Sequence, residues 1–203
     1  MRRVRLEKIL ASPDELSRLR DLLASGGVAG VPTETFYALA SDPTNERGVS
    51  RIFEIKGRDD GKPLLVLFCS RGDLERLGVA AAPRLLDRLF GIWPAPLTVV
   101  LPLAAPIAAS RGVSTLAVRL PAAPDVRALL SVVGPMTGTS ANRSGGAPLA
   151  DPDQVARLLG ADLDLLVDGG PTLGGQPSTI VDATVDPARI LRAGAFAWTD
   201  WRE

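Results

Sequence analysis

Residues 12–31 read SPDELSRLRDLLASGGVAGV, and this stretch decides the class of the fold. Ser12 can cap a helix, Pro13 suits the first helical position, and Glu15 can reach back to complete a capping box. Leucines then recur at helical spacing until a pair of glycines ends the helix. An apolar strand over residues 28–31 follows directly. A helix that leads at once into a short apolar strand indicates an α/β or α+β fold.

The same alternation of helix and strand continues along the chain. Helices are predicted over residues 49–56, 84–90, 125–132 and 155–159. Further strands are predicted over residues 64–68, 98–101, 115–120, 136–139, 163–167, 179–182 and 190–191. Their irregular spacing predicts a mixed sheet flanked by helices. Because the sequence contains no repeat and no linker, we expect a single domain over residues 1–203 with its core at roughly 10–195.

Composition excludes several classes of function. Histidine is absent, which excludes Ser-His-Asp and Cys-His nucleophiles and every histidine-based metal site. Cys69 is the only cysteine, so it cannot form an internal disulfide, and its apolar surroundings predict a buried, reduced thiol. Lys plus Arg and Asp plus Glu number 23 each, so RNA binding would need a local basic patch. No signal peptide and no membrane span are recognisable, so we expect a cytoplasmic protein.

Two polar clusters lie in the first third of the chain. Residues 32–37 (PTETFY) place two threonines after a strand, where local hydrogen bonding is a more common explanation than a binding site. Lys56, Arg58 and Lys62 are separated by glycine and proline, in a loop that could surround a phosphate. A solvated surface loop explains the same residues, and the loop lacks the Walker A pattern.

Two further clusters come later in the chain. Residues 137–146 (TGTSANRSGG) combine small residues with hydroxyl and amide donors after an apolar strand, which favours a ligand site at a strand end. Arg119 and Arg192 lie within or beside apolar strands and need an anionic partner. That partner is either an internal aspartate, such as Asp168 or Asp182, or a ligand. Together with the basic loop, the arginines favour a polyanionic small molecule such as a nucleotide.

Read together, these clusters resemble the YrdC-like family. The matching segments occur in the family's order and cover roughly residues 15–195: Val31–Tyr37, Lys56–Arg58, Lys62–Leu64, Trp93–Thr98, Ser114–Pro121, Thr139–Gly145, Asp168–Pro171, Ser178–Asp182 and Ile190–Arg192. The resemblance implies a twisted mixed β-sheet flanked by helices around a large concave basic cavity. Some relatives carry an additional C-terminal domain, and the length of this chain leads us to expect none here.

The resemblance implies a nucleotidyltransferase, an L-threonylcarbamoyladenylate synthase. Such an enzyme makes threonylcarbamoyl-AMP and pyrophosphate from L-threonine, bicarbonate or CO₂, and ATP with Mg²⁺. Its product passes to a tRNA threonylcarbamoyl-transferase complex, which modifies the adenosine next to the anticodon. Two alternatives remain open at this point. They are a non-catalytic RNA-binding paralogue and a carbamoyl-transfer module with another acceptor.

The resemblance also assigns roles to individual residues. Lys56 and Arg58 are the expected catalytic residues. The expected ATP contacts are Arg58, Lys62, Thr115, Asn142 and Arg192. The expected L-threonine contacts are Thr35, Arg119, Ser140 and Ser178. No metal ligand is expected from the protein. Leu67 stands where many relatives have a histidine that contacts threonine.

Overall fold

The computed structural model describes residues 1–57 and 61–199. Its strands are β1 (Arg2–Arg5), β2 (Ala29–Pro32), β3 (Tyr37–Ala40), β4 (Val66–Leu67), β5 (Leu97–Pro102), β6 (Thr115–Arg119), β7 (Met136–Thr137), β8 (Thr139–Ser140), β9 (Leu165–Asp168), β10 (Thr179–Asp182) and β11 (Arg189–Arg192). Its helices are α1 (Leu6–Leu10), α2 (Pro13–Ala24), α3 (Glu46–Lys56), α4 (Arg71–Arg76), α5 (Pro83–Ile92), α6 (Pro124–Val133) and α7 (Pro152–Leu159), and a 3-10 turn covers Ala108–Ser110.

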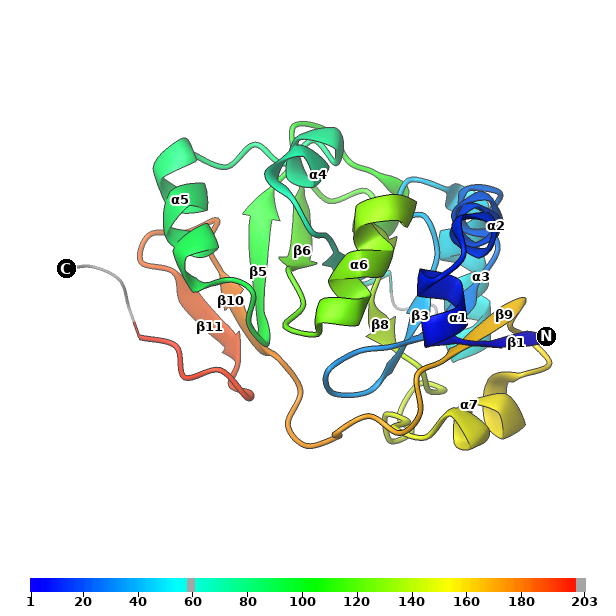
Figure 1. Cartoon of the computed structure of the whole chain (residues 1–203). Helices are drawn as coiled ribbons and strands as arrows, with labels where there is room; N and C mark the ends of the chain where they lie inside the picture. The colour runs from blue at the N-terminus through cyan, green and yellow to red at the C-terminus, as the bar shows by residue number, and fades with distance from the viewer. Residues whose placement is uncertain (58–60, 200–203) are drawn as a thin grey trace.

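The strands form two mixed sheets, so the expectation of a single mixed sheet is corrected in this respect (Figure 1). One sheet has five strands in the order β1-β9-β2-β3-β8, and the other has six in the order β11-β10-β5-β6-β4-β7. Both combine parallel pairs, such as β1 with β9 and β5 with β10, with antiparallel pairs. The mixed α/β class predicted from the sequence is confirmed.

The start of α2 is fixed by a local capping interaction that the sequence predicts. Ser12 accepts a hydrogen bond from the backbone N–H of Glu15 at 3.3 Å, and Pro13 occupies the first turn. The predicted capping box is wrong in its second half, because the Glu15 carboxylate accepts hydrogen bonds from Arg2 and Arg18 instead. These contacts tie α2 to β1, an edge strand of the five-stranded sheet.

The two sheets meet at Thr137–Gly138–Thr139, within the strand predicted over 136–139. β7 pairs with β4 in one sheet and β8 pairs with β3 in the other. Gly138 lies at the break and donates its N–H to the Leu65 carbonyl at 2.7 Å. A Cβ atom at Gly138 would lie 2.6 Å from Cγ of Leu67, so only glycine fits without displacement. The close approach of these chains fixes the position of the segment that follows.

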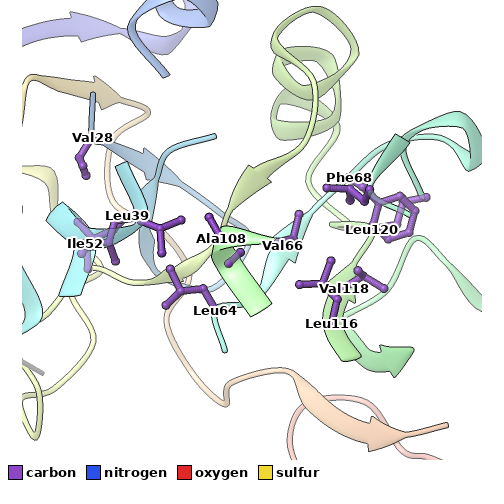
Figure 2. Packing of buried hydrophobic residues seen from close by; sticks show 14 of the residues in the cluster. Val28, Leu39, Ile52, Leu64, Val66, Phe68, Ala108, Leu116, Val118 and Leu120 are labelled. Atoms are coloured by element: carbon purple, nitrogen blue, oxygen red, sulfur yellow. The ribbon is translucent and has the colours of Figure 1, made fainter. Parts of the chain in front are cut away.

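One hydrophobic cluster extends across both sheets. Figure 2 shows it from Val28, Leu39 and Ile52 at one end to Val118 and Leu120 at the other. A shared core of this kind holds the sheets in one arrangement. No helix among residues 1–57 and 61–199 is long and apolar enough to cross a membrane.

Cys69 follows β4 and is half-buried, so the expectation of a buried thiol is corrected. Its Sγ lies 3.3 Å from Oδ2 of Asp73, which also accepts the backbone N–H groups of Cys69 and Ser70 at 2.9 Å. Burial raises the pKa of the Cys69 thiol to about 11, and the hydrogen bond with Asp73 acts in the same direction. A thiol with this pKa is a poor nucleophile at neutral pH.

Candidate functional site

A cavity of about 440 Å³ opens where the two sheets meet, a volume typical of small-molecule sites. Its polar lining comes from seven separate parts of the chain: Thr33, Thr35 and Tyr37; Lys56; Thr98; Arg119; Thr139, Ser140, Asn142 and Ser144; Ser178; and Arg192. Among the described residues, no acidic side chain belongs to this lining. The cavity therefore presents cations, hydroxyls and amides to a ligand.

The two threonines in the turn between β2 and β3 have different roles. Oγ1 of Thr33 donates to the Phe36 carbonyl at 2.7 Å and accepts the N–H groups of Thr35 and Phe36, so Thr33 makes the turn. The carbonyl of Thr35 accepts from Gly174 N–H and from Thr172 Oγ1, both at 2.7 Å. These contacts fix the backbone of the turn and leave the Thr35 side chain at the cavity.

Lys56 ends α3, and its ammonium group supports the loop after β8. The side chain is 4% exposed, and Nζ donates to the Ser140 carbonyl at 2.7 Å. Nζ also donates to the Asn142 carbonyl at 3.2 Å and to Asn142 Oδ1 at 3.1 Å. Gly57 follows in the left-handed region, with φ of 60°, and lets the chain leave the helix. Lys56 thereby joins α3 to one wall of the cavity.

Ser140 and Asn142 form a closed hydrogen-bond network within this loop. Ser140 Oγ donates to Asn142 Oδ1 at 2.6 Å, and Asn142 Nδ2 donates to the carbonyls of Arg143 and Gly146. The loop is thus pre-organised, because its own polar groups set its shape. Such a preformed loop loses little conformational entropy when a ligand binds.

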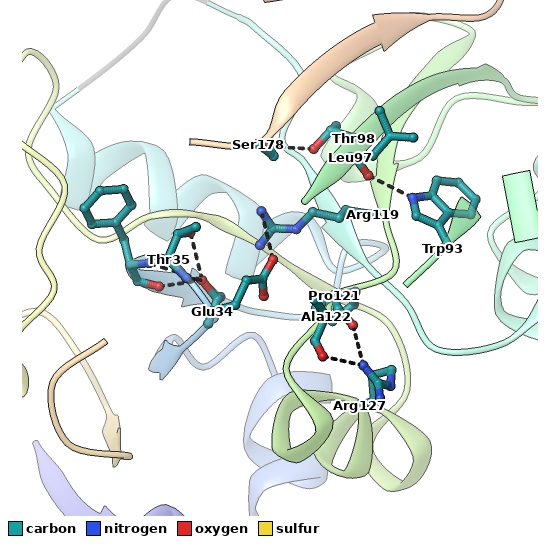
Figure 3. A network of polar contacts seen from close by, with 12 residues as sticks. Glu34, Thr35, Trp93, Leu97, Thr98, Arg119, Pro121, Ala122, Arg127 and Ser178 are labelled. Carbon is teal, nitrogen blue, oxygen red and sulfur yellow. Dashed lines mark hydrogen bonds and ion pairs between the residues drawn. The ribbon is translucent and has the colours of Figure 1, made fainter. Parts of the chain in front are cut away.

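Two arginines, Arg119 and Arg192, also line the cavity, and Figure 3 shows Arg119 beside Glu34. Arg119 is 4% exposed, and its Nη1 lies 3.7 Å from Oε1 of Glu34. Arg192 donates to the Ser178 carbonyl at 2.7 and 3.2 Å and to Ser178 Oγ at 3.3 Å. Ser178 Oγ in turn lies 2.9 Å from Oγ1 of Thr98, which is also buried. The arrangement places two guanidinium groups beside a pair of hydroxyls.

The electrostatics of this pair favour an anion. Burial lowers the pKa of the Arg119 guanidinium below its usual range, the negative charge of Glu34 opposes this, and the charge of Arg192 adds to the lowering. Burial also lowers the pKa of Arg192. A carboxylate or phosphate placed between the two guanidinium groups would compensate for their loss of hydration and would reduce the repulsion between their positive charges. The site is therefore suited to an acidic ligand.

The anionic partner of Arg119 differs from the two candidates that the sequence suggested. Asp168 instead pairs with Arg3 and Arg5, at 2.9 and 3.5 Å. Asp182 pairs with Arg189 at 3.7 Å. The internal partner of Arg119 is Glu34, which sequence reasoning quoted within PTETFY but assigned no role. The topology of the fold explains this partner, because the turn after β2 reaches β6, whereas the two aspartates face other strands.

The structure brings most of the predicted site residues to this one cavity. Its lining includes Thr35, Lys56, Arg119, Ser140, Asn142, Ser178 and Arg192. Lys62 is exposed and Thr115 half-buried, and the structure places both outside this lining. Arg58 lies outside the described residues. Sequence reasoning missed Thr98 as well as Glu34, although Thr98 ends the segment Trp93–Thr98 that carried part of the resemblance.

Leu67, the position where many relatives have a histidine, does not line the cavity. Leu67 is fully buried against Gly138, and it is Leu65, two residues earlier, that lines the cavity. Among residues 1–57 and 61–199, no group of three or more Cys, Asp or Glu side chains could hold a metal ion.

Comparisons with known proteins agree with this fold. A protein named threonylcarbamoyl-AMP synthase from Pyrococcus abyssi is 35% identical over 179 residues, covering 86% of this chain and 52% of that protein. One with the same name from Thiobacillus denitrificans is 35% identical over 178 residues, covering 86% of this chain and 93% of that protein. A crystal structure of P. abyssi Sua5 complexed with L-threonine has a TM-score of 0.82 and 31% identity, and the match covers 95% of this chain and 56% of that one.

The chain thus spans about half the length of the Pyrococcus proteins it matches. A family profile named Sua5_yciO_yrdC, described as telomere recombination, matches residues 21–194. This match covers most of the chain, including every residue that lines the cavity. The chain belongs to the Sua5/YciO/YrdC family.

Proposed function

We propose that this protein is a threonylcarbamoyl-AMP synthase. L-threonine reacts with bicarbonate or CO₂ to give a carbamate, and a carboxylate oxygen of that carbamate attacks the α-phosphorus of ATP. The bond from the α-phosphorus to pyrophosphate breaks, and threonylcarbamoyl-AMP forms. With bicarbonate as the carbon source, one water is released. The observation that carries the proposal is that buried Arg119 and the more exposed Arg192 line one cavity, in a chain whose relatives carry this name.

Arg119 is assigned the α-carboxylate of L-threonine, because a guanidinium fork matches a carboxylate and this one lies within the wall. Thr35, Ser140 and Ser178 supply hydroxyls or carbonyls for the polar groups of the amino acid. The cavity, at about 440 Å³, is larger than a single amino acid, and the nucleotide is assigned to its remaining part. Proximity within one cavity would place the carbamate in line with the phosphate.

The ATP side is assigned to Lys56, Arg58, Asn142 and Arg192, with Lys62 and Thr115 as further contacts. Charge neutralisation at the α-phosphate needs cations, and Lys56 and Arg192 both line the cavity. Mg²⁺ would enter bound to the triphosphate, because no acidic side chain among the described residues lines the cavity. No covalent nucleophile is required, which suits a chain without histidine.

Three further expectations from the sequence remain proposals. We infer that the product passes to a tRNA threonylcarbamoyl-transferase complex, because the relatives' product is an activated, labile acyl donor that needs an acceptor. A cytoplasmic location would suit ATP and tRNA as substrates of the overall pathway. RNA binding by this chain would require a local basic patch, since its formal net charge is zero.

Pyrophosphate release tests the proposal. The protein is incubated with ATP, Mg²⁺ and bicarbonate, with L-threonine present or omitted. We expect release that depends on threonine, together with a product that carries both adenylate and threonine by mass spectrometry. Release that requires a different amine would indicate a carbamoyl-transfer module. RNA binding without any turnover would instead indicate the non-catalytic alternative.

A further inference from the structure

The carboxylate of Glu34 lies against Arg119 at the cavity wall, and the two residues come from distant parts of the chain. Figure 3 shows the side chains pointing toward one another. The Glu34 side chain is 14% exposed and that of Arg119 is 5% exposed. Both carboxylate oxygens and Nε of Arg119 are buried, and none of the three has a hydrogen-bond partner among the described residues. Buried polar atoms of this kind call for an explanation.

The pair interacts by charge rather than by hydrogen bonding. A separation of 3.7 Å between Nη1 and Oε1 is too long for a hydrogen bond. Glu34 therefore compensates the charge of Arg119 without consuming its N–H donors. Those donors stay available to a second acceptor, which a bidentate Arg–Glu pair would have prevented. This distinguishes the pair from an ordinary structural salt bridge.

The backbone around Glu34 is held on both sides. Thr33 closes the turn through its hydroxyl, and the Thr35 carbonyl accepts two hydrogen bonds at 2.7 Å from the segment 172–174. Thr33 and Thr35 both line the cavity, whereas Glu34 between them does not. The turn thus presents its threonines to the cavity and the Glu34 carboxylate to the Arg119 guanidinium in the cavity wall.

Arg192 makes a counter-ion necessary. Two guanidinium groups line the same cavity, and their charges act against each other. Among the described residues, Glu34 is the only acidic side chain within 4.0 Å of Arg119. Without it, a buried guanidinium would face a like charge, and the arrangement would favour withdrawal of Arg119 from the wall.

We propose that Glu34 is a positioning residue that acts through Arg119, holding the guanidinium in the wall so that its remaining N–H donors receive the α-carboxylate of an amino acid. The inference rests on the proposed function, because L-threonine is the amino acid that the site is assigned. Loss of the Glu34 charge should therefore weaken the binding of L-threonine and leave the binding of ATP unchanged. Glu34 touches neither substrate directly in this account.

Glu34→Gln tests the inference, because glutamine keeps the shape of the side chain and removes its charge. Under saturating ATP, we expect the KM for L-threonine to rise about tenfold or more. The kcat and the KM for ATP should stay within about threefold of wild type. Glu15→Gln is the matched control, since Glu15 is a similarly buried, arginine-paired glutamate outside the cavity. It should leave the KM for L-threonine unchanged.

A second pair of variants separates positioning from a general loss of structure. If Glu34 acts through Arg119, Glu34→Gln should add nothing to the effect of Arg119→Gln in a double variant. Should Glu34→Gln fail to fold, Glu34→Asp keeps the charge with a shorter reach. A smaller rise in KM for threonine than in Arg119→Gln is then expected.

The outcomes distinguish the two proposals. A wild-type protein without threonine-dependent pyrophosphate release would overturn the proposed function and this inference with it. An active wild type with an unchanged or lowered KM for threonine in Glu34→Gln would overturn the inference alone. So would an effect of Glu34→Gln that persists at full size in the Arg119→Gln background, or a Glu34→Asp variant as impaired as Arg119→Gln.

Discussion

Replacing Lys56 by methionine should destabilise the protein as well as impair the site. Methionine matches the length of the lysine stem but carries no donors. In the structure, the ammonium group makes three hydrogen bonds to the loop at Ser140 and Asn142. Hydrogen bonds to a charged group are each worth roughly 1.5–3 kcal/mol, and the desolvation that buried lysine requires offsets part of their sum. We expect a net loss of about 2–4 kcal/mol.

Urea unfolding followed by circular dichroism and tryptophan fluorescence measures this loss, and the melting temperature should fall by about 5–15 °C. Hydrogen exchange should also become faster at the amides of residues 139–146, because the loop loses its anchor. Lys8→Met serves as the control, since Lys8 is exposed on α1. It should change stability by less than about 0.5 kcal/mol. A Lys56→Met protein as stable as wild type, with unchanged exchange in the loop, would refute this role of Lys56.

Other consequences of the structure are open to similar measurements. Gly138→Ala should lower the free energy of unfolding by about 1–3 kcal/mol, because its Cβ would meet Leu67 at 2.6 Å. Gly91→Ala is the control and should not lower the free energy of unfolding, because a Cβ atom there meets nothing within 4 Å. Burial alone would raise the pKa of Asp73, but hydrogen bonds, the largest from the backbone of Cys69, hold it below its ordinary value. The carboxylate therefore stabilises the fold above its unfolded pKa of about 3.9, and this contribution is lost as pH falls through the lower folded value. The stability difference between wild type and Asp73→Asn should shrink on going from pH 6 to pH 3, and a constant difference would contradict the assignment. With a pKa of about 11, Cys69 should react slowly with iodoacetamide at pH 8 in the folded protein and rapidly in urea. Rapid reaction in both states would contradict the raised pKa of the Cys69 thiol.

The sequence predicts the fold best where a local signal is sufficient. Ser12 and Pro13 mark the start of α2, and the apolar run over 179–182 matches β10. Elements without such signals were missed. β1 has a single apolar residue between arginines and becomes a strand only by pairing with β9. β3 is buried on both faces and follows a threonine-rich turn, so alternation gives no sign of it.

The candidate site could be assembled from sequence only in part. Resemblance and chemistry identified Arg119 and Arg192, because an arginine among apolar residues requires an anion. The partner of Arg119 could not be identified in the same way, since Glu34 precedes it by a long stretch of chain and pairs with it only through the packing of the turn against β6. The resemblance assigned Lys62 to ATP, yet Lys62 does not belong to the cavity lining, whereas its neighbour Pro63 does.

A crystal structure with L-threonine and a non-hydrolysable ATP analogue would test most directly whether one cavity holds both substrates. We expect the threonine carboxylate within hydrogen-bond distance of the Arg119 guanidinium, and the triphosphate on the side of Lys56 and Asn142. Threonine bound away from Arg119, or a nucleotide seated in the separate groove lined by residues 185–190, would contradict this expectation.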